Sequence, residues 1–323
     1  MSKVIRIYAH GGTEVLKLEE VPMPEPGPGE VLIRHKAMGV NYADVYFRVG
    51  LYGAPLPTSL GVEGAGEVLA IGAGVSEFQP GDRVAYAGGP LGAYATERVI
   101  SADRLVKLPD AIDDTTAAAM LLRGFTAHYL LRRTRQVQAT DTILVHAAAG
   151  GVGLILCQWA KHIGATVIGV VSTPEKAAIV KACGADHVIV GSSELPAEVK
   201  RITGGEMVQV VYDSVGKDTF MASLDCLAPL GMMVSYGIAS GPVPPVDLGI
   251  LAAKGSLFLT RPSLATYTAK REDRMEAASE LFDLVRKGIV KIRVNQTLPL
   301  ANAAVAHALL ESRQTTGSIV LIP

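Results

Sequence analysis

The sequence is poor in cysteine, in aromatic residues and in net charge. Its 323 residues include three cysteines, 5% aromatic residues and a formal net charge of −1. Cys157, Cys183 and Cys226 are odd in number, far apart and set in apolar segments, which excludes a disulfide framework and predicts buried thiols in a reducing, cytoplasmic setting. The absence of a basic run argues against nucleic acid or an anionic membrane surface as a partner.

Long hydrophobic runs are also missing. The mean hydropathy of +0.31 is high, yet no run reaches the roughly 18 apolar residues that a transmembrane helix needs. The first residues, Met1–Ile7, form a strand pattern broken by charge, so we expect no signal peptide there. The chain is long enough for two domains with substantial cores.

A glycine turn stands at the centre of the chain. Residues Gly150, Gly151, Val152 and Gly153 follow the apolar segment Thr142–Val145 and precede a helical pattern from Leu154 to His162. Because a strand–glycine–helix unit presents backbone N–H groups to a pyrophosphate, this pattern predicts a nucleotide-binding loop. A second strand pattern, Ala165–Val171, follows at the spacing of a βαβ unit and supports that interpretation.

The end of that second strand indicates which dinucleotide binds. A site for NAD usually places an acidic residue there to bind the ribose 2′-OH. This chain instead has Ser172, Thr173 and Lys176, which suit a 2′-phosphate and favour NADPH. A structural interpretation is compatible with this one: Ser172 or Thr173 caps a helix, and Pro174 occupies its first turn.

Periodicity divides the chain into three parts. Short strands between glycine and proline turns predict a compact β-rich barrel up to about residue 107, and a helical pattern covers Asp113–Arg133. Six alternating strands then predict a doubly wound parallel sheet of the Rossmann type. A tail with a helix at Arg274–Lys287, a strand near Ile292–Val294, a helix near Ala301–Glu311 and a strand at Gly317–Ile322 is expected to return to the first domain. The six expected strands are Thr142–Val145, Ala165–Val171, His187–Val190, Val208–Asp213, Met232–Tyr236 and Ser256–Thr260.

Two motifs resemble the medium-chain dehydrogenase/reductase superfamily. Residues 61–68, with Gly81-Asp82-Arg83-Val84, look like its signature, and residues 148–153 resemble its zinc-independent quinone oxidoreductase branch, the zeta-crystallin-like proteins. The resemblance covers essentially the whole chain. It implies a GroES-like catalytic domain at 1–125 completed by 264–323, a Rossmann domain at 126–263, a cleft between them, a homodimer paired near Val246–Leu259, and NADPH-dependent reduction of quinones.

The resemblance also implies individual site residues. It places Asn41, Tyr46 and Tyr52 in the nicotinamide and substrate pocket, where Asn41 binds the carboxamide or ribose and the tyrosines donate protons and stack on a flat substrate. Asp44 is expected only to start a helix. Where close relatives have a tyrosine, this chain has Gly191, which leaves more of the 2′-phosphate to Lys176 and Arg313. The expected cofactor contacts also include Thr126, Gly150, Gly151, Val152, Ser172, Thr173, Ser214, Tyr236, Gly237, Leu259, Thr260 and Arg261.

The residues that bind zinc in other branches are missing. Val62 stands where zinc-dependent relatives place a histidine before Glu63, and Asn41 stands where they carry a cysteine. Zinc needs three or four closely placed ligands, so we expect Glu63 to be an interior carboxylate and His146 a structural residue. Without a Lewis acid the chain is poorly equipped to polarise a simple ketone, whereas a quinone accepts hydride with less help.

Two other functions fit the same residues. The first is an NADPH-dependent enone or alkenal reductase, which would use the same zinc-free pocket to deliver hydride to an activated alkene. The second is a non-catalytic NADPH-binding protein of crystallin-like or RNA-binding type. The pI near 6.7 and the lack of basic stripes argue against RNA.

Overall fold

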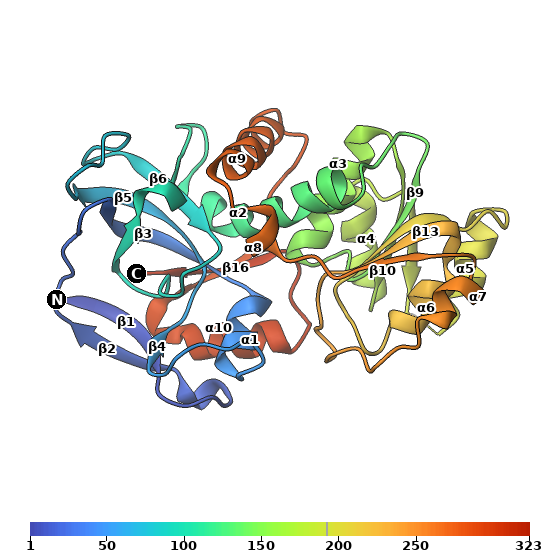
Figure 1. The fold of residues 1–323 in the computed structure, drawn as a ribbon, viewed down its shortest axis with the longest axis horizontal. Coiled ribbons are helices and arrows are strands. Elements are labelled where there is room, and N and C mark those ends of the chain that lie inside the picture. The colour runs from blue at the N-terminus through green and yellow to red at the C-terminus, as the bar shows by residue number, and fades with distance from the viewer. Residues whose placement is uncertain (192) are drawn as a thin grey trace. The chain divides into compact units, whose positions relative to one another are not determined.

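The computed structural model describes residues 1–191 and 193–323, and the chain divides into two units. The first comprises residues 1–124, 270–286 and 292–323, and the second comprises residues 125–269 and 287–291. The two units are coloured by residue number in Figure 1. The helix α2 (Asp114–His128) runs across the boundary at Gly124. Within the described residues, no helix combines the length and apolar character needed to cross a bilayer.

Unit 1 is built on two sheets. The larger has the strand order β15-β16-β3-β5-β6-β8 with β7 also paired to β3, and the smaller has the order β2-β1-β4. The remaining pieces are helices and short 3₁₀ turns. The elements of this unit are β1 (Ser2–Ile7), η1 (Thr13–Val15), β2 (Lys17–Val21), β3 (Glu30–Val40), α1 (Tyr42–Arg48), β4 (Thr58–Ser59), β5 (Glu63–Ile71), β6 (Arg83–Ala87), β7 (Glu97–Ser101), η2 (Ala102–Arg104), β8 (Val106–Lys107), α9 (Arg271–Arg286), β15 (Val294–Pro299), η4 (Leu300–Asn302), α10 (Ala303–Glu311) and β16 (Ser318–Ile322).

The C-terminal tail forms part of the unit 1 core. Strand β16 pairs antiparallel with β3, where Val320 lies opposite Gly39, and parallel with β15. Its buried side chains Ile319 and Leu321 join Ile5 of β1, Met38 of β3 and residues of α10 in one hydrophobic cluster. Burial of such side chains stabilises the fold by about 1.5–3 kcal/mol each, so the core of unit 1 requires both ends of the chain.

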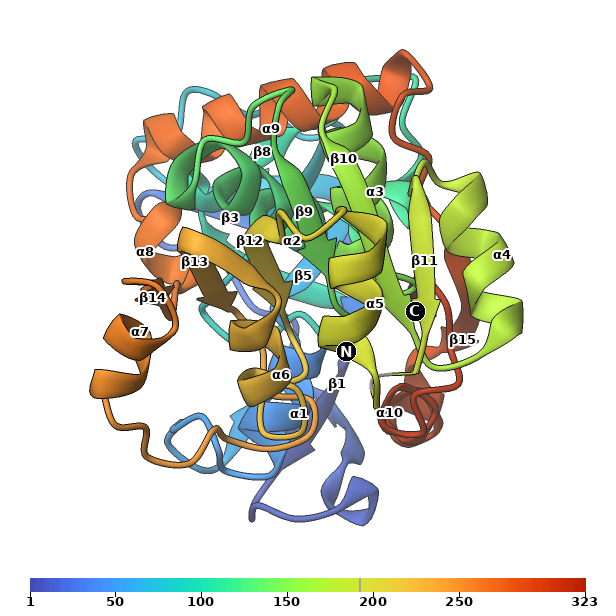
Figure 2. The same cartoon turned by 90° about the vertical axis from the view of Figure 1, so that its right-hand side faces the viewer.

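Unit 2 is a six-stranded parallel sheet of the predicted Rossmann type. Its strand order is β11-β10-β9-β12-β13-β14, and Figure 2 shows the strands with helices on both faces. The fold class predicted from the sequence is confirmed. The elements are η3 (Tyr129–Thr134, a π-helix), β9 (Thr142–Val145), α3 (Gly151–Ile163), β10 (Thr166–Val171), α4 (Pro174–Ala182), β11 (His187–Val190), α5 (Leu195–Ile202), β12 (Val208–Asp213), α6 (Phe220–Asp225), β13 (Leu227–Ser235), α7 (Gly249–Ala253), β14 (Phe258–Thr260) and α8 (Leu264–Tyr267).

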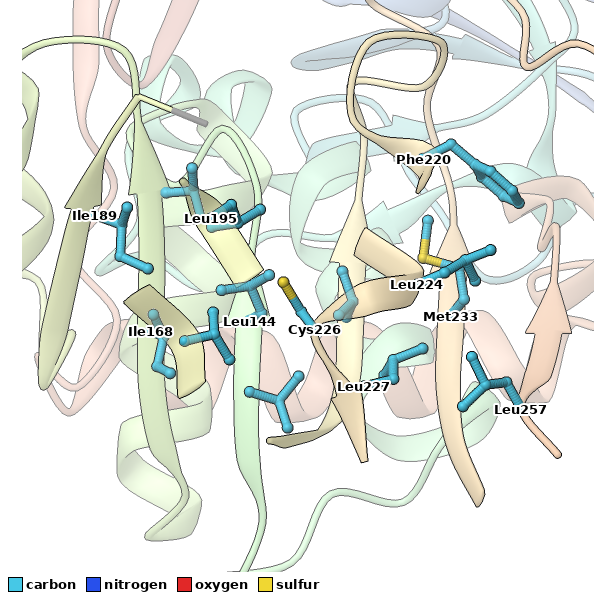
Figure 3. Close-up of a cluster of buried hydrophobic side chains, with 14 residues drawn as sticks. Leu144, Ile168, Ile189, Leu195, Phe220, Leu224, Cys226, Leu227, Met233 and Leu257 are labelled. Atoms are coloured by element: carbon cyan, nitrogen blue, oxygen red, sulfur yellow. The ribbon is translucent and has the colours of Figure 1, made fainter. Parts of the chain in front are cut away.

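The two faces of this sheet carry different helices. Ile168 of β10 and Leu144 of β9 pack with Leu195 of α5 and Leu224 of α6 in one buried cluster, which Figure 3 shows. Gly169 points to the opposite face, where an added Cβ would lie 2.7 Å from a methyl carbon of Val180 in α4. Successive strand residues alternate in direction, so α5 and α6 cover one face and α4 the other.

Several boundaries differ from the sequence prediction. The helix predicted at 113–133 is α2 followed by the π-helix η3, within which the Leu130 carbonyl accepts a hydrogen bond of 2.9 Å from the Tyr212 hydroxyl. Strand β15 begins at Val294, later than predicted, because its register is set by pairing with Ser318–Ile322. The prediction of three buried thiols is wrong for Cys183, which is half-buried, whereas Cys157 and Cys226 are buried and burial raises the pKa of each thiol to about 12.

Candidate active site

The glycine turn of unit 2 lies between β9 and α3, as predicted. The residue before α3, Gly150, is extended, and α3 begins at Gly151. A Cβ on Gly153 would come within 2.5 Å of the Ala147 carbonyl oxygen and 2.7 Å of the Ala148 Cα. Glycine therefore allows the first turn of α3 to pack directly on the loop. The unpaired N–H groups of that first turn form the kind of cradle that binds a pyrophosphate, so the residues present fit a dinucleotide.

A buried polar network joins the ends of β9 and β12. The Asp213 carboxylate accepts hydrogen bonds from the hydroxyls of Thr219 (2.7 Å) and Ser223 (2.9 Å) and from two N–H groups of the following turn. Since Ser223 donates its only hydroxyl proton to Asp213, His146 Nε2 donates to Ser223 Oγ at 2.9 Å. Burial lowers the pKa of His146. His146 is thus a hydrogen-bonded structural residue, as predicted, and fixes the two strand ends from which the cofactor loops leave.

The residues that follow β10 form a helix start. Thr173 is the N-cap of α4, its hydroxyl accepts a hydrogen bond from the Lys176 N–H at 3.4 Å, and Pro174 occupies the first turn. The predicted capping role is therefore confirmed for Thr173. Ser172 is exposed, and Lys176 is half-buried with a pKa lowered by burial. All three predicted 2′-phosphate residues lie within one turn of the carboxyl end of β10.

Most of the remaining predicted cofactor contacts in unit 2 lie at other strand ends, and Thr126 lies in helix α2. Gly237 packs against Ser214, because a Cβ on Gly237 would lie 2.5 Å from the Ser214 carbonyl oxygen. Arg261 donates a hydrogen bond of 2.8 Å to the Ser235 carbonyl at the end of β13. Thr126 is buried in α2, and Tyr236, Leu259 and Thr260 are partly or largely exposed. Ligands of doubly wound sheets bind at these carboxyl ends, so the sheet brings most of the predicted set to one edge.

The predicted substrate residues in unit 1 gather on α1 and the loop after it. Asn41 precedes α1, Tyr46 is buried within it, and Tyr52 follows it with an exposed side chain. The rings of Tyr46 and Tyr52 meet edge to face with centroids 5.2 Å apart. The Tyr52 N–H donates to the Tyr46 carbonyl at 3.1 Å. The two phenols therefore form one aromatic cluster, which also includes Phe47.

Asn41 is hydrogen-bonded to a buried ion pair between Glu63 and Arg123. Its Nδ2 donates to Glu63 Oε2 at 2.9 Å, and Arg123 Nη1 donates to the same oxygen at 3.1 Å. Glu63 Oε1 accepts the Leu122 N–H at 2.7 Å. Burial raises the pKa of Glu63, while the Arg123 charge opposes that rise. The prediction of Glu63 as an interior carboxylate is confirmed, and the Asn41 side chain also accepts from the Asp44 N–H in the capping box of α1.

Arg123 was not predicted as part of this site. It lies within the apolar stretch Ala117–Phe125 of α2, and an arginine in an otherwise apolar helix face indicates a buried partner. Its Nη2 also donates to the Val40 carbonyl at 2.6 Å. Gly39 allows this packing, because a Cβ there would collide with the Ala118 carbonyl and the Glu63 carboxylate.

Arg313, in the C-terminal tail, lies just beyond α10. It is exposed, and its φ of 57° is in the left-handed region, which is uncommon for a residue other than glycine. Nearby, the Tyr42 hydroxyl donates to the Leu310 carbonyl at 3.0 Å. Among the residues that the structure describes, no group of three or more His, Cys, Asp or Glu side chains is arranged to hold a metal ion.

Comparisons with known proteins identify the family. Residues 27–110 match the alcohol dehydrogenase GroES-like domain, and residues 151–283 match the zinc-binding dehydrogenase domain. Over the full length of both proteins, the chain is 53% identical to a quinone oxidoreductase of Pseudomonas aeruginosa and 49% identical to quinone oxidoreductase 1 of Escherichia coli. The chain belongs to the quinone oxidoreductases of the medium-chain dehydrogenase/reductase superfamily.

Solved structures agree with this assignment. The crystal structure of Escherichia coli quinone oxidoreductase complexed with NADPH has a TM-score of 0.97 and 48% identity, and the match covers 99% of this chain and 100% of that chain. A 2-haloacrylate reductase of Burkholderia is 47% identical over 98% of each chain. The family resemblance inferred from the motifs is therefore confirmed.

Proposed function

We propose that this protein is an NADPH-dependent quinone oxidoreductase that works without zinc. The observation that carries the proposal is the glycine turn at the β9–α3 junction, where the strand order reverses between β9 and β12. The full-length identity to quinone oxidoreductases and the NADPH complex of the Escherichia coli protein support it. These relatives favour a quinone over an enone as the acceptor and favour an enzyme over a non-catalytic binding protein.

The cofactor is held by the strand ends of unit 2. Gly150, Gly151 and Val152 bind the pyrophosphate through backbone N–H groups, and Ser214 and Gly237 line the neighbouring strand ends. Ser172, Thr173 and Lys176 bind the 2′-phosphate, and Arg313 of the tail assists them. Thr126, Tyr236, Leu259, Thr260 and Arg261 complete the contacts. When bound, NADPH supplies a hydride from C4 of its nicotinamide.

The acceptor is handled by residues of unit 1. Tyr46 and Tyr52 present aromatic faces for a flat quinone and phenol protons for the oxyanion that develops as it is reduced. Asn41, hydrogen-bonded to Glu63, would contact the carboxamide or ribose. The hydrogen bond from Asn41 to the buried Glu63–Arg123 ion pair keeps the Asn41 side chain in one orientation. Orientation of the reacting groups is the main contribution that a protein makes to hydride transfer.

Steady-state kinetics test this function. The purified, chelator-treated protein is assayed with NADPH and with NADH, using 1,4-benzoquinone as acceptor and 2-cyclohexenone and 2-chloroacrylate as comparison substrates. Fast turnover of benzoquinone with NADPH, slow turnover with NADH and no effect of chelator support the proposal. Faster reduction of either alkene than of the quinone overturns the substrate class, and tight NADPH binding without turnover of any acceptor overturns the enzymatic role.

We also propose that unit 2 forms a homodimer through strand β14. This strand lies at one edge of the sheet, where its backbone groups are unpaired on one side. Phe258 on the strand is 57% exposed, and Leu248 before it and Leu230 beside the same edge are more exposed still. Pairing of two β14 strands about a two-fold axis would satisfy the edge and bury these side chains. Cys157, Cys183 and Cys226 form no disulfide with one another, which supports a reducing, cytoplasmic location.

A further inference from the structure

Helix α1, which carries Tyr46, is tied to α10 at both ends. At its first residue, the Tyr42 hydroxyl donates to the Leu310 carbonyl at 3.0 Å. At its last residue, Arg48 is 2% exposed and forms a two-pronged ion pair with Glu311, with N–O distances of 2.8 and 2.9 Å. Paired N–H···O bonds of this kind fix geometry as well as adding energy. The position of α1 is therefore set by the tail helix.

A series of hydrogen bonds connects Arg48 to Asp44, both on α1, by way of His307 of α10 and Tyr94. Arg48 Nη1 donates to His307 Nδ1 at 3.3 Å, His307 Nε2 lies 3.1 Å from the Tyr94 hydroxyl, and that hydroxyl donates to Asp44 Oδ2 at 3.0 Å. Because arginine can only donate, the ring proton of His307 sits on Nε2 and points to Tyr94. Burial and the Arg48 charge lower the pKa of His307 to about 3, so this neutral ring persists at working pH.

Asp44 is the last residue in this series of hydrogen bonds and lies next to Asn41 of the candidate active site. Its Oδ2 also accepts the Asn41 N–H at 2.8 Å, while its Oδ1 is buried and has no hydrogen-bond partner among the described residues. Both hydrogen bonds thus use one oxygen, and the other oxygen can carry a proton without disturbing them. Asp44 can therefore gain or lose a proton while both hydrogen bonds stay in place, and its ionisation changes how strongly they hold Asn41 and Tyr94.

The charged and hydrogen-bonding groups that act on Asp44 come from several elements of unit 1. Glu63 of β5 raises its pKa, Arg123 of α2 lowers it, and the hydrogen bonds from Asn41 and Tyr94 lower it as well. The largest effect is burial, and together these raise the pKa of Asp44 to about 7. Arg48 and His307 are connected to Asp44 by hydrogen bonds through the Tyr94 hydroxyl. The carboxylate form strengthens the hydrogen bond to the Asn41 N–H and stabilises the N-terminus of α1.

We propose that Asp44 is a positioning residue for quinone reduction, which holds Asn41 and the first turn of α1 in the productive arrangement when it is ionised. The inference rests on the proposed function, because it takes Asn41 and Tyr46 as the groups that meet cofactor and acceptor. It assigns Tyr94, His307 and Arg48 the role of orienting Asp44. It predicts that kcat/KM for the quinone rises with pH as Asp44 loses its proton.

The pH profile of kcat/KM for 1,4-benzoquinone at saturating NADPH tests the proposal. The wild type should rise several-fold through an inflection near the pKa of Asp44, about 7. Asp44→Asn should lack the inflection and stay low throughout. Tyr94→Phe should move the inflection to higher pH, because the carboxylate loses a hydrogen bond that favours the charged form. The dissociation constant for NADPH should change by a smaller factor than kcat/KM, since the glycine turn is untouched and only the Asn41 contact is disturbed.

Tyr86→Phe is the matched control. Tyr86 is another buried tyrosine of unit 1, and its hydroxyl contacts His35 Nε2 at 2.8 Å and Arg98 Nη1 at 3.0 Å. Its removal should leave the inflection in place. If Asp44→Asn does not fold, the comparison of Tyr94→Phe with Tyr86→Phe decides. An unchanged inflection in folded Asp44→Asn, or equal shifts in the two tyrosine variants, overturns the positioning role alone. Absence of wild-type quinone turnover overturns it together with the proposed function.

Discussion

At the scale of single residues, the site contains two kinds of side chain. Asn41, Glu63 and Arg123 are buried and bonded to one another, so their positions are set by folding. Tyr52 and Lys176 lie nearer solvent. Substitution of the first kind changes stability and function together, whereas substitution of the second kind reports on the ligand.

Lys176→Ala should raise the KM for NADPH about five- to tenfold, the loss expected for one charge-assisted hydrogen bond. The KM for NADH should hardly change, because NADH lacks the 2′-phosphate. Steady-state kinetics with both cofactors measure this. Lys181→Ala, in the last turn of the same helix α4, is the control and should leave both KM values unchanged. Equal increases for the two cofactors would show that Lys176 does not bind the 2′-phosphate.

Tyr52→Phe should lower kcat/KM for the quinone several-fold while leaving the thermal unfolding midpoint within a degree or two. The ring packing against Tyr46 and Phe47 is kept, and only the phenol proton is lost. Tyr8→Phe, an exposed tyrosine of the same unit, provides the comparison. Quinone kinetics that match those of the wild type would remove Tyr52 as a proton donor.

At the scale of elements, the α3 helix depends on the absence of a side chain. Gly153→Ala places a Cβ against the Ala147 carbonyl oxygen, which belongs to backbone that cannot rotate away. We expect α3 to shift, the dissociation constant for NADPH to rise at least tenfold and stability to fall by about 1–3 kcal/mol. Fluorescence titration and thermal unfolding measure both effects. Gly249→Ala, where the added Cβ meets only the flexible Asp247 side chain, should change neither, and wild-type affinity in Gly153→Ala would contradict the argument.

Most helices and strands could be predicted from the sequence, because the residue patterns that indicate them are local. Strands β9, β11 and β12 have the predicted bounds, since each is a short apolar run flanked by turn residues. The late start of β15 and the π-helix η3 were not predictable, because the first depends on pairing with β16 and the second coincides with a contact from Tyr212. The glycine turn and the helix cap at Thr173 are local as well, and both are confirmed.

The buried networks of hydrogen bonds and ion pairs could not be predicted from the sequence. Asp44 and Arg48 are four residues apart on α1, a spacing that favours a mutual ion pair. In the structure they pair elsewhere, Asp44 with Tyr94 and Arg48 with Glu311. Partners 50 and 263 residues away leave no periodic signal. The roles of the predicted site residues toward NADPH and quinone stay predictions.

At the scale of the molecule, Asp44 makes stability depend on pH. Its pKa of about 7 in the folded protein lies above the ordinary value of 3.8, so between these values the folded state holds a proton that the unfolded state has lost. The contribution of Asp44 to the free energy of unfolding therefore falls as pH rises through this window and levels off above 7. Denaturant unfolding of wild type and Asp44→Asn at about pH 5 and pH 8 measures it. The variant should lose less stability over that range than the wild type, and parallel losses would contradict the assignment.

Phe258→Glu should convert the proposed dimer to a monomer, because a charge at an apolar paired edge is costly to bury. Sedimentation velocity over a range of concentrations measures the change. Met221→Glu introduces the same charge at an exposed position on α6 and should leave the assembly unchanged. A wild type that sediments as a monomer, or a Phe258→Glu variant that stays dimeric, would place the interface elsewhere.

The position of β16 between β15 and β3 in the unit 1 sheet has a consequence for synthesis on the ribosome. Residues 125–269 of unit 2 are complete in the chain long before residues 318–322 are made. Unit 2 can therefore fold during translation, while the edge of β3 at Met38–Val40 stays unpaired until β16 is made. Loss of only the last few residues would leave that edge unpaired and the core of unit 1 incomplete. Cellular quality control should thus degrade late-truncated products, even though their nucleotide-binding unit is fully encoded.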